Sequence, residues 1–292
     1  MLQQLIAIIA PILICAGLGY AWARRGIDYP VEFVTRAVMN IGAPCLIIAS
    51  FNESGIDVAL LGEITAATLS VMLLVLLASV ALIRLLRLET STFVPSLLFP
   101  NTGNMGLPLC LFAFGETGLA LGLTVFLVVF TLQMSFGILL VAGHGKFREL
   151  LKQPVLWATA IAVAMVLGDW SLPGWLANTT GLLGGFTIPL MLITLGVSLA
   201  DLEVRNWRHS LWFSVARVMG GFGIGMLVAK LFGLEGVERG ALILQASMPV
   251  AVFNYLLAVR YGREPGEVAG MVVMSTLLSF LLLPLIVAYV LL

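Results

Sequence analysis

The sequence predicts an all-α, polytopic membrane protein, and three features of the chain lead to this prediction. The 292 residues are 61% hydrophobic and only 10% charged, whereas a soluble domain is about 25% charged. The apolar residues form long runs, and a run of about 18 residues can span a bilayer as a helix. Prolines recur at matching positions in the two halves, which indicates an internal repeat. The formal net charge is zero, so composition gives no reason to expect nucleic-acid binding.

The hydrophobic runs predict ten transmembrane helices rather than a β-barrel, whose strands would appear as alternating segments of about ten residues. The expected spans are 4–23, 32–51, 62–83, 92–114, 118–142, 154–169, 177–199, 209–231, 239–259 and 268–291. In the first run the basic residues, Arg24 and Arg25, follow the apolar segment. We therefore expect a first membrane helix here and not a cleaved signal peptide.

Basic residues alternate between the connecting loops, and this alternation predicts the orientation. Eleven of the 15 basic residues fall in odd-numbered loops, and the opposite loops hold only Lys230 and Arg239. The eleven are Arg24, Arg25, Arg84, Arg87, Lys146, Arg148, Lys152, Arg205, Arg208, Arg260 and Arg263. Because basic loops stay in the cytoplasm, we expect a multi-pass protein of the inner (plasma) membrane with both termini outside.

Proline spacing predicts that the chain consists of two repeats. Pro11 and Pro154 are 143 residues apart, Pro44 and Pro189 are 145 apart, and Pro108 and Pro249 are 141 apart. We expect a first five-helix repeat over 1–142, a cytoplasmic linker over 143–153 and a second five-helix repeat over 154–292. Because five is an odd number, the two repeats would be inserted in opposite orientations, a pattern found in secondary transporters.

Two expected spans contain polar interruptions and are predicted to be broken helices. Span four contains NTGNMGLPL (Asn101–Leu109), and span nine contains QASMPVAVFN (Gln245–Asn254). Proline costs about 3 kcal/mol inside a helix, and broken backbone is tolerated at membrane depth only where it is buried or lines a cavity. We predict that the breaks in helices four and nine face each other at a substrate site, where N–H ends favour an anion and C=O ends favour a cation. A proline kink packed by small residues is the simpler structural alternative.

The candidate substrate-binding residues are the polar and helix-breaking residues of the two interruptions, together with two amides in neighbouring spans. They are Asn101, Thr102, Asn104, Gly106, Pro108, Gln245, Ser247, Pro249, Asn254, Asn40 and Gln133. The chain contains neither HExxH nor GxSxG, so we expect no enzyme, no catalytic residue, no metal site and no cofactor. No carboxylate or histidine lies near the predicted midplane, which disfavours a proton-coupled pump.

Two arginines lie inside predicted spans. Arg36 is about five residues from the cytoplasmic end of its span and is expected to anchor at the interface. Arg217 lies about nine residues deep, and we expect it to snorkel or to form a structural pair; a gate pair or an anion attractor is the alternative. Gly221 and Gly225 on the same span form GxxxG and predict a helix contact.

The two interrupted segments also resemble the corresponding segments of the auxin efflux carrier family, in its bacterial branch. NTGNMGLPL and QASMPVAVFNYLLAVRYG (Gln245–Gly262) carry the resemblance, which extends over the chain in length, span count and repeat. It implies ten helices in two inverted halves, with a scaffold group, a transport group and crossing broken helices. It also implies elevator-type export of organic anions such as auxin, malate or malonate. By the same resemblance the crossover or site residues would be Asn101, Asn104, Pro108, Gln245 and Pro249.

The expected function is export of small organic anions, secondary active or facilitative, driven by the membrane potential at about 2.3 kcal/mol per charge per 100 mV. The main alternative is a sodium-coupled importer of organic anions of the bile-acid symporter type. The cation sites of that type usually use an acidic residue near the second break, where this chain has Gln245. The expected partners are the transported anion and membrane lipid. A homodimer is compatible with the sequence.

Overall fold

The computed structural model describes residues 2–143 and 151–292, and every helix among them is an α-helix or a π-helical turn. In the first half the elements are α1 (Leu2–Arg24), α2 (Val31–Ala37), η1 (Val38–Gly42), α3 (Ala43–Ser54), α4 (Val58–Leu85), α5 (Thr90–Leu98), η2 (Thr102–Gly106), α6 (Leu107–Leu132), η3 (Gln133–Gly137) and α7 (Ile138–Ala142). In the second half they are α9 (Pro154–Gly168), α10 (Gly174–Gly185), α11 (Thr187–Asp201), α12 (Trp207–Leu231), α13 (Gly236–Ala246), α14 (Val252–Tyr261) and α15 (Pro265–Leu291). Most of the predicted linker over 143–153, with Lys146 and Arg148, lies outside the described residues.

Seven helical segments of the described chain are long and apolar enough to cross a membrane, so the protein is an all-helical, multi-pass membrane protein. They are Leu2–Arg24, Val31–Ser54, Val58–Leu85, Thr102–Ala142, Gly174–Asp201, Trp207–Leu231 and Pro265–Leu291. The predicted count of ten is not confirmed, because α9 is shorter and two predicted spans are divided into short helices. The segment Thr102–Ala142 also covers parts of two predicted spans.

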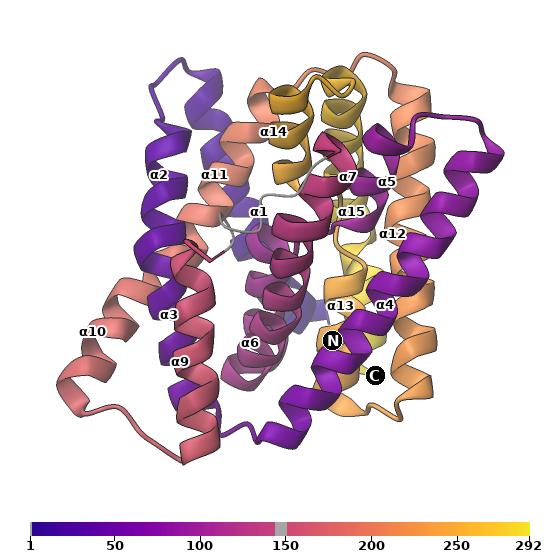
Figure 1. The fold of residues 1–292 in the computed structure, drawn as a ribbon. Helices are drawn as coiled ribbons and strands as arrows, with labels where there is room; N and C mark the ends of the chain where they lie inside the picture. The colour runs from indigo at the N-terminus through magenta and orange to yellow at the C-terminus, as the bar shows by residue number, and fades with distance from the viewer. Residues whose placement is uncertain (1, 144–150) are drawn as a thin grey trace.

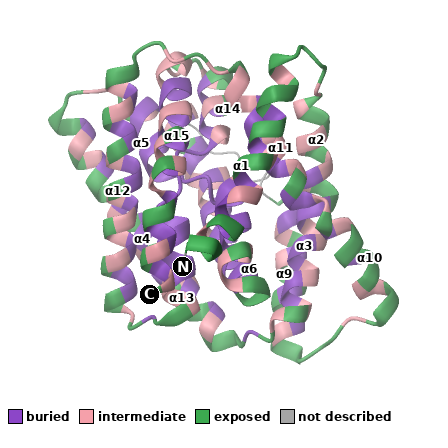
Figure 2. Cartoon of the chain, turned by 180° about the vertical axis from the view of Figure 1, so that it is seen from behind, coloured by how far each residue is buried: buried purple, intermediate pink, exposed green. Residues whose placement is uncertain are grey.

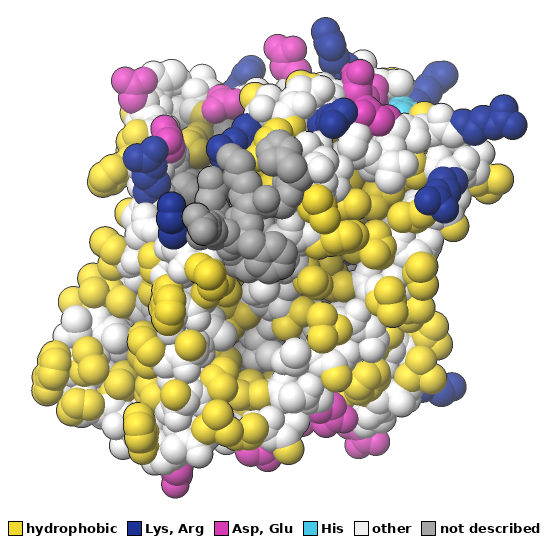
Figure 3. All heavy atoms as spheres, in the orientation of Figure 1, with side chains coloured by type: hydrophobic (Ala, Val, Ile, Leu, Met, Phe, Trp, Pro, Cys, Tyr) yellow, Lys and Arg dark blue, Asp and Glu magenta, His cyan; other side chains and the backbone are white. Residues whose placement is uncertain are grey.

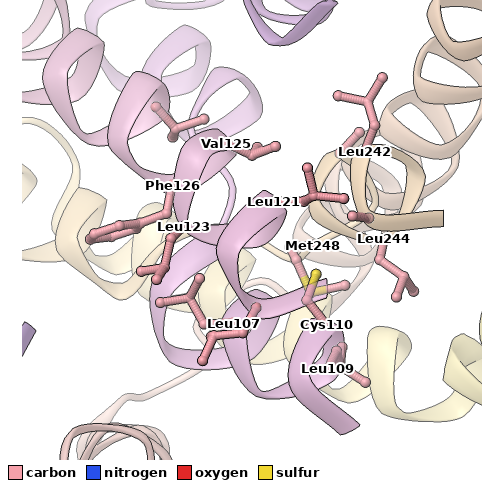
Figure 4. Packing of buried hydrophobic residues seen from close by; sticks show 14 of the residues in the cluster. Leu107, Leu109, Cys110, Leu121, Leu123, Val125, Phe126, Leu242, Leu244 and Met248 are labelled. Carbon is pink, nitrogen blue, oxygen red and sulfur yellow. The ribbon is translucent and has the colours of Figure 1, made fainter. Parts of the chain in front are cut away.

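The helix labelled α6 consists of two antiparallel limbs joined at Gly115. Gly115 has φ 66° and ψ −155°, a backbone conformation outside the helical region that glycine adopts readily. A Cβ at Gly122 would lie 3.0 Å from the Cβ of Cys110, a contact that a continuous helix cannot make across 12 residues. Figure 4 shows Cys110 and Leu121 from these limbs beside Leu244 and Met248 of the second half. The two limbs of α6 and the chain around α13 therefore share one core.

Local sequence signals set several helix ends. The Asp57 side chain accepts a hydrogen bond from the backbone N–H of Leu60 (2.7 Å) and so caps α4. Pro154 and Pro265 stand in the first turns of α9 and α15, where a missing N–H removes no intrahelical hydrogen bond. Gly55 ends α3 in the left-handed conformation, with φ 60°.

The helices form two groups that lie side by side, as Figure 1 shows. In the first group α1 packs against α11, and α3 packs against α9 and α10. In the second group α12 packs against α13, α15 and α4. The helix α6 lies between the groups and contacts α1 and α3 on one side and α4 and α13 on the other. Figure 2 shows that the buried residues concentrate on the faces that these helices turn toward one another.

The surface is that of a membrane protein. Figure 3 shows most of the visible Lys and Arg side chains at the upper end, acidic side chains at both ends and a hydrophobic belt between them. All six tryptophans are exposed, including Trp22 and Trp207 near the basic end and Trp170 and Trp175 near the other end. Tryptophan is enriched where the bilayer meets water, so the belt between these residues marks the hydrocarbon layer.

Two glycines bring α1 and α11 into backbone contact. A Cβ at Gly19 would lie 2.0 Å from the carbonyl oxygen of Ile193, and a Cβ at Gly196 would lie 1.9 Å from that of Ala16. Small residues allow such close approach between membrane helices, where van der Waals packing is a main attraction. The two glycines hold the first helix of the first half on the second half of the chain.

We expect Gly19→Ala to lower the stability of the protein by about 1–3 kcal/mol, because the added methyl group forces α1 away from α11. The midpoint of thermal unfolding in detergent measures this effect. The matched control is Gly17→Ala on the same helix, where a Cβ would meet no atom within 4 Å. If both variants unfold at the wild-type temperature, the close contact at Gly19 does not contribute to the stability of the fold.

Candidate functional site

Two interruptions of the helical backbone meet near the centre of the molecule. The first runs from Phe99 to Asn101, between α5 and η2, and the second from Ser247 to Ala251, between α13 and α14. The N–H of Asn101 donates to the carbonyl of Pro249 (2.7 Å), and the N–H of Ala251 donates to the carbonyl of Phe99 (3.2 Å). Together with the antiparallel bridge between Pro100 and Val250, these bonds join the two breaks. The predicted crossing of two broken helices is therefore present.

The first break lies at Pro100, immediately before the predicted interruption Asn101–Leu109, and not at Pro108. Pro108 is the second residue of α6 and follows η2 without interruption. A proline inside a membrane helix is tolerated where a local π-helical turn adjusts the backbone hydrogen bonds, and η2 directly precedes Pro108. The proposed repeat partner of Pro249 is thus inside a helix, and the residue that faces the second break is Pro100.

Buried side chains satisfy the polar groups of the crossing. The Nδ2 of Asn254 donates to the carbonyl of Phe99 (3.2 Å), and the Nε2 of Gln133 donates to the Oδ1 of Asn254 (2.8 Å). The N–H of Val250 donates to the Oγ of Ser275 (3.0 Å). Buried polar groups that lack partners are costly, so this network stabilises the crossing and links it to η3 and α15.

The carbonyl ends of both breaks converge on Arg217. Its Nη1 donates to the carbonyl of Leu97 (3.1 Å), its Nη2 to that of Ala246 (2.7 Å) and its Nε to that of Met248 (3.2 Å). The residue is 2% exposed, so it does not snorkel to the membrane surface. Arg36 is different: its exposed side chain pairs with Glu32 one turn earlier, as an interface residue can.

The N–H ends of both breaks face a cavity of about 380 Å³ between the two helix groups. Residues Asn101–Asn104 at the start of η2 and Ala251–Phe253 at the start of α14 line it. Thr194 and Ser198 of α11 line the cavity from the other helix group, and Arg260 lies at the end of α14. Because Arg260 and its neighbours belong to the basic end of the molecule, the cavity extends from the crossing to that end.

The electrostatics of this cavity favour an anion. A helix N-terminus carries about half a positive elementary charge, and its first N–H groups have no intrahelical partner. Two such termini line the cavity, and Arg260 adds a full positive charge. Among the described residues that line it, none is Asp or Glu. A carboxylate bound here would meet converging N–H donors and the amides of Asn101 and Asn104.

The structure places the predicted residues in four settings. Asn101, Thr102, Asn104 and Gln133 line the cavity. Pro249 and Asn254 hold the crossing through the hydrogen bonds above. Gly106, Pro108, Gln245 and Ser247 are buried behind it, and a Cβ at Gly106 would lie 2.1 Å from the Oε1 of Gln245. Asn40 is exposed on η1 and does not line the cavity.

Sequence reasoning did not place three of the lining residues in the site. Thr194 and Ser198 are four residues apart and share one face of α11, and Thr194 is hydrogen-bonded to the hydroxyl of Tyr29 (2.8 Å). This spacing of two hydroxyls in an apolar span was the available signal. Arg260 was counted only as a basic loop residue, although it ends the helix that begins at the crossing.

The chain is similar to known membrane transport proteins. Residues 146–287 match a family described as membrane transport protein. An uncharacterized transporter of Methanothermobacter thermautotrophicus is 29% identical over 300 residues, covering 94% of this chain and 94% of the relative. An uncharacterized transporter of Methanocaldococcus jannaschii is 25% identical over 195 residues, covering 63% of each chain.

Proposed function

We propose that the chain, whose residues 146–287 match the membrane transport protein family, carries small organic anions through the cavity at the helix crossing. The single observation that supports this substrate class is the meeting of two helix N-termini at one cavity, with no Asp or Glu among the described residues that line it. Carboxylates such as malate, malonate or auxin-like acids fit this chemistry, since two helix ends and an arginine attract negative charge.

The direction that we propose is export driven by the membrane potential. The cavity reaches the basic end of the molecule, which is cytoplasmic if the positive-inside rule holds for this chain. An anion that enters from the cytoplasm moves outward down its electrical gradient, at about 2.3 kcal/mol per charge per 100 mV. In this orientation both termini are outside.

The mechanism that we propose is an elevator-type exchange between two orientations of the group that holds the crossing. The cavity lies between the helix groups, with α11 on one side and the crossing on the other. Movement of α4–α7 and α12–α15 against α1–α3 and α9–α11 would carry the bound anion across. In this reading α5 with the first limb of α6, and α13 with α14, each form one broken span. The chain then has ten spans in two inverted repeats.

The test is current in voltage-controlled proteoliposomes with malate, malonate, succinate and indole-3-acetate, with and without sodium and a pH gradient. We expect a saturable, sodium-independent current that Asn104→Ala reduces strongly. The matched control is Asn40→Ala, an equal truncation outside the cavity lining. Sodium-dependent uptake would favour an importer of the bile-acid symporter type. Equal currents in the wild type and Asn104→Ala would contradict the proposal that the substrate binds at the crossing.

A further inference from the structure

Arg217 is a buried cation whose hydrogen bonds run to carbonyl oxygens, and no carboxylate of the described residues pairs with it. Its three donors bind the carbonyls of Leu97, Ala246 and Met248. Leu97 lies in the last turn of α5, Ala246 is the last residue of α13, and Met248 lies in the second break. One guanidinium therefore joins the C-terminal ends of both interrupted helices.

The charge of this guanidinium matches the charge of the groups around it. Each helix C-terminus carries about half a negative elementary charge, so the two ends together balance the one positive charge of an arginine. A buried charge without such compensation would be strongly destabilising. Arginine stays protonated in proteins, and its planar fork can reach several carbonyls at once.

Carriers that use sodium bind the ion at such places, because half-helix C-termini and unwound carbonyls supply its oxygen ligands. We propose that the Arg217 guanidinium is a built-in cation that takes the place of a coupling ion at the crossing. This inference rests on the proposed anion transport and concerns the energy coupling of that transport. The crossing needs no sodium ion, because Arg217 supplies the positive charge. The carbonyl ends are neutralised by Arg217, while the N–H ends keep their positive potential for the substrate.

Two neighbouring features support this role. The Oε1 of Gln245 is buried without a hydrogen-bond partner among the described residues. Together with Arg217 and Thr68, Gln245 lines a cavity of about 10 Å³, room for about one water molecule. If the arginine side chain were removed, this space would join the volume it leaves. The oxygens there would be three backbone carbonyls, the Gln245 amide and the Thr68 hydroxyl, which are hard ligands of the kind that small hard cations prefer.

Gly221 explains how the guanidinium comes so close. A Cβ at Gly221 would lie 2.0 Å from the carbonyl oxygen of Ala246 and 3.3 Å from the Nη2 of Arg217. A Cβ at Gly225, one turn later, would lie 3.0 Å from the Cβ of Ala246. The predicted GxxxG contact is thus confirmed. It allows α12 to pack closely against the end of α13, where Arg217 donates its hydrogen bonds.

The experiment compares thermal unfolding of the purified full-length protein in sodium chloride and in choline chloride at equal ionic strength. The wild type is expected to unfold at the same temperature in both salts. In choline, Arg217→Ala is expected to unfold about 10 °C lower, because three carbonyls lose their donors and two helix ends lose their counter-charge. Sodium is expected to restore part of this loss in a concentration-dependent way. The charge-keeping control, Arg217→Lys, is expected to show no sodium response.

A sodium-specific rise in the unfolding temperature of the wild type would overturn the proposal, and this measurement does not depend on any variant. The same holds if Arg217→Ala is as stable as the wild type in choline, or if sodium fails to stabilise it. The readout involves no transported substrate. Failure to find an anion current would therefore contradict the proposed function. The effect of sodium on unfolding would still test the role of Arg217 separately.

Discussion

Asn104→Asp is expected to reduce anion affinity by about a thousandfold. Asn104 lines the cavity within the first turn of η2, where the N–H ends of the crossing face the proposed substrate. The substitution keeps the size of the side chain and adds a negative charge. Two like charges about 4 Å apart repel by about 4 kcal/mol at the effective dielectric of a partly buried site, and each 1.4 kcal/mol is tenfold in affinity. Half-saturation of the anion current in proteoliposomes measures the change.

The matched control for this charge is Asn178→Asp. Asn178 is exposed on α10, far from the lining of the cavity, so the same change in chemistry should leave the half-saturation unaltered. Both variants should unfold near the wild-type temperature, because neither asparagine makes a described side-chain hydrogen bond that the substitution would break. Wild-type affinity in Asn104→Asp would mean that the anion does not bind beside η2.

The hydrophobic runs were sufficient to predict an all-helical, multi-pass membrane protein and the approximate positions of many of its helices. The match of residues 146–287 to the membrane transport protein family supports the family resemblance in the second half of the chain, which contains the second polar interruption. Pro44 and Pro189 do occupy similar places: each follows a local irregularity, η1 before α3 and the turn at Phe186 before α11. Such features can be predicted from the sequence because each depends on the residues of its own segment.

The exact position of the first break could not be predicted from the sequence, because contacts with the other half of the chain determine it. Pro100 and Pro108 are both plausible helix breakers, and only the pairing of Phe99 and Asn101 with the second break selects the first. Arg217 is a similar case. Its depth in the span suggested snorkelling or a structural pair, and its actual partners are carbonyls that converge only in three dimensions.

Asn40 shows why a polar residue inside a predicted span need not belong to the site. It lies in the π-helical turn η1 (Val38–Gly42), where backbone hydrogen bonds reach back five residues instead of four. Asn40 was chosen as an amide inside a predicted span, and residue type alone does not show which side of the helix faces the cavity. Gln133 was chosen in the same way, also lies in a π-helical turn, and does line the cavity. Asn101, Thr102 and Asn104 were identified correctly as lining residues because they are polar and lie next to the break itself.

The second large effect is expected from the pair that braces the crossing, Gln133 and Asn254. Asn254→Leu leaves the buried Nε2 of Gln133 without its acceptor, and Gln133→Leu leaves the Oδ1 of Asn254 without its donor. We expect each single substitution to cost about 1–3 kcal/mol, because a buried polar group without a partner loses its hydration and gains no hydrogen bond. The midpoint of thermal unfolding in detergent reports both losses.

The double variant separates the stability of the crossing from its function. With both side chains replaced by leucine, no orphaned amide of this pair remains, so the double variant should be more stable than the sum of the single losses predicts, with a coupling of about 1–2 kcal/mol. Transport should not recover with it, because Gln133 lines the cavity and Asn254 fixes the carbonyl of Phe99. Strictly additive losses would mean that the Gln133–Asn254 hydrogen bond contributes nothing. Wild-type transport in the double variant would show that the anion does not require this rigid crossing.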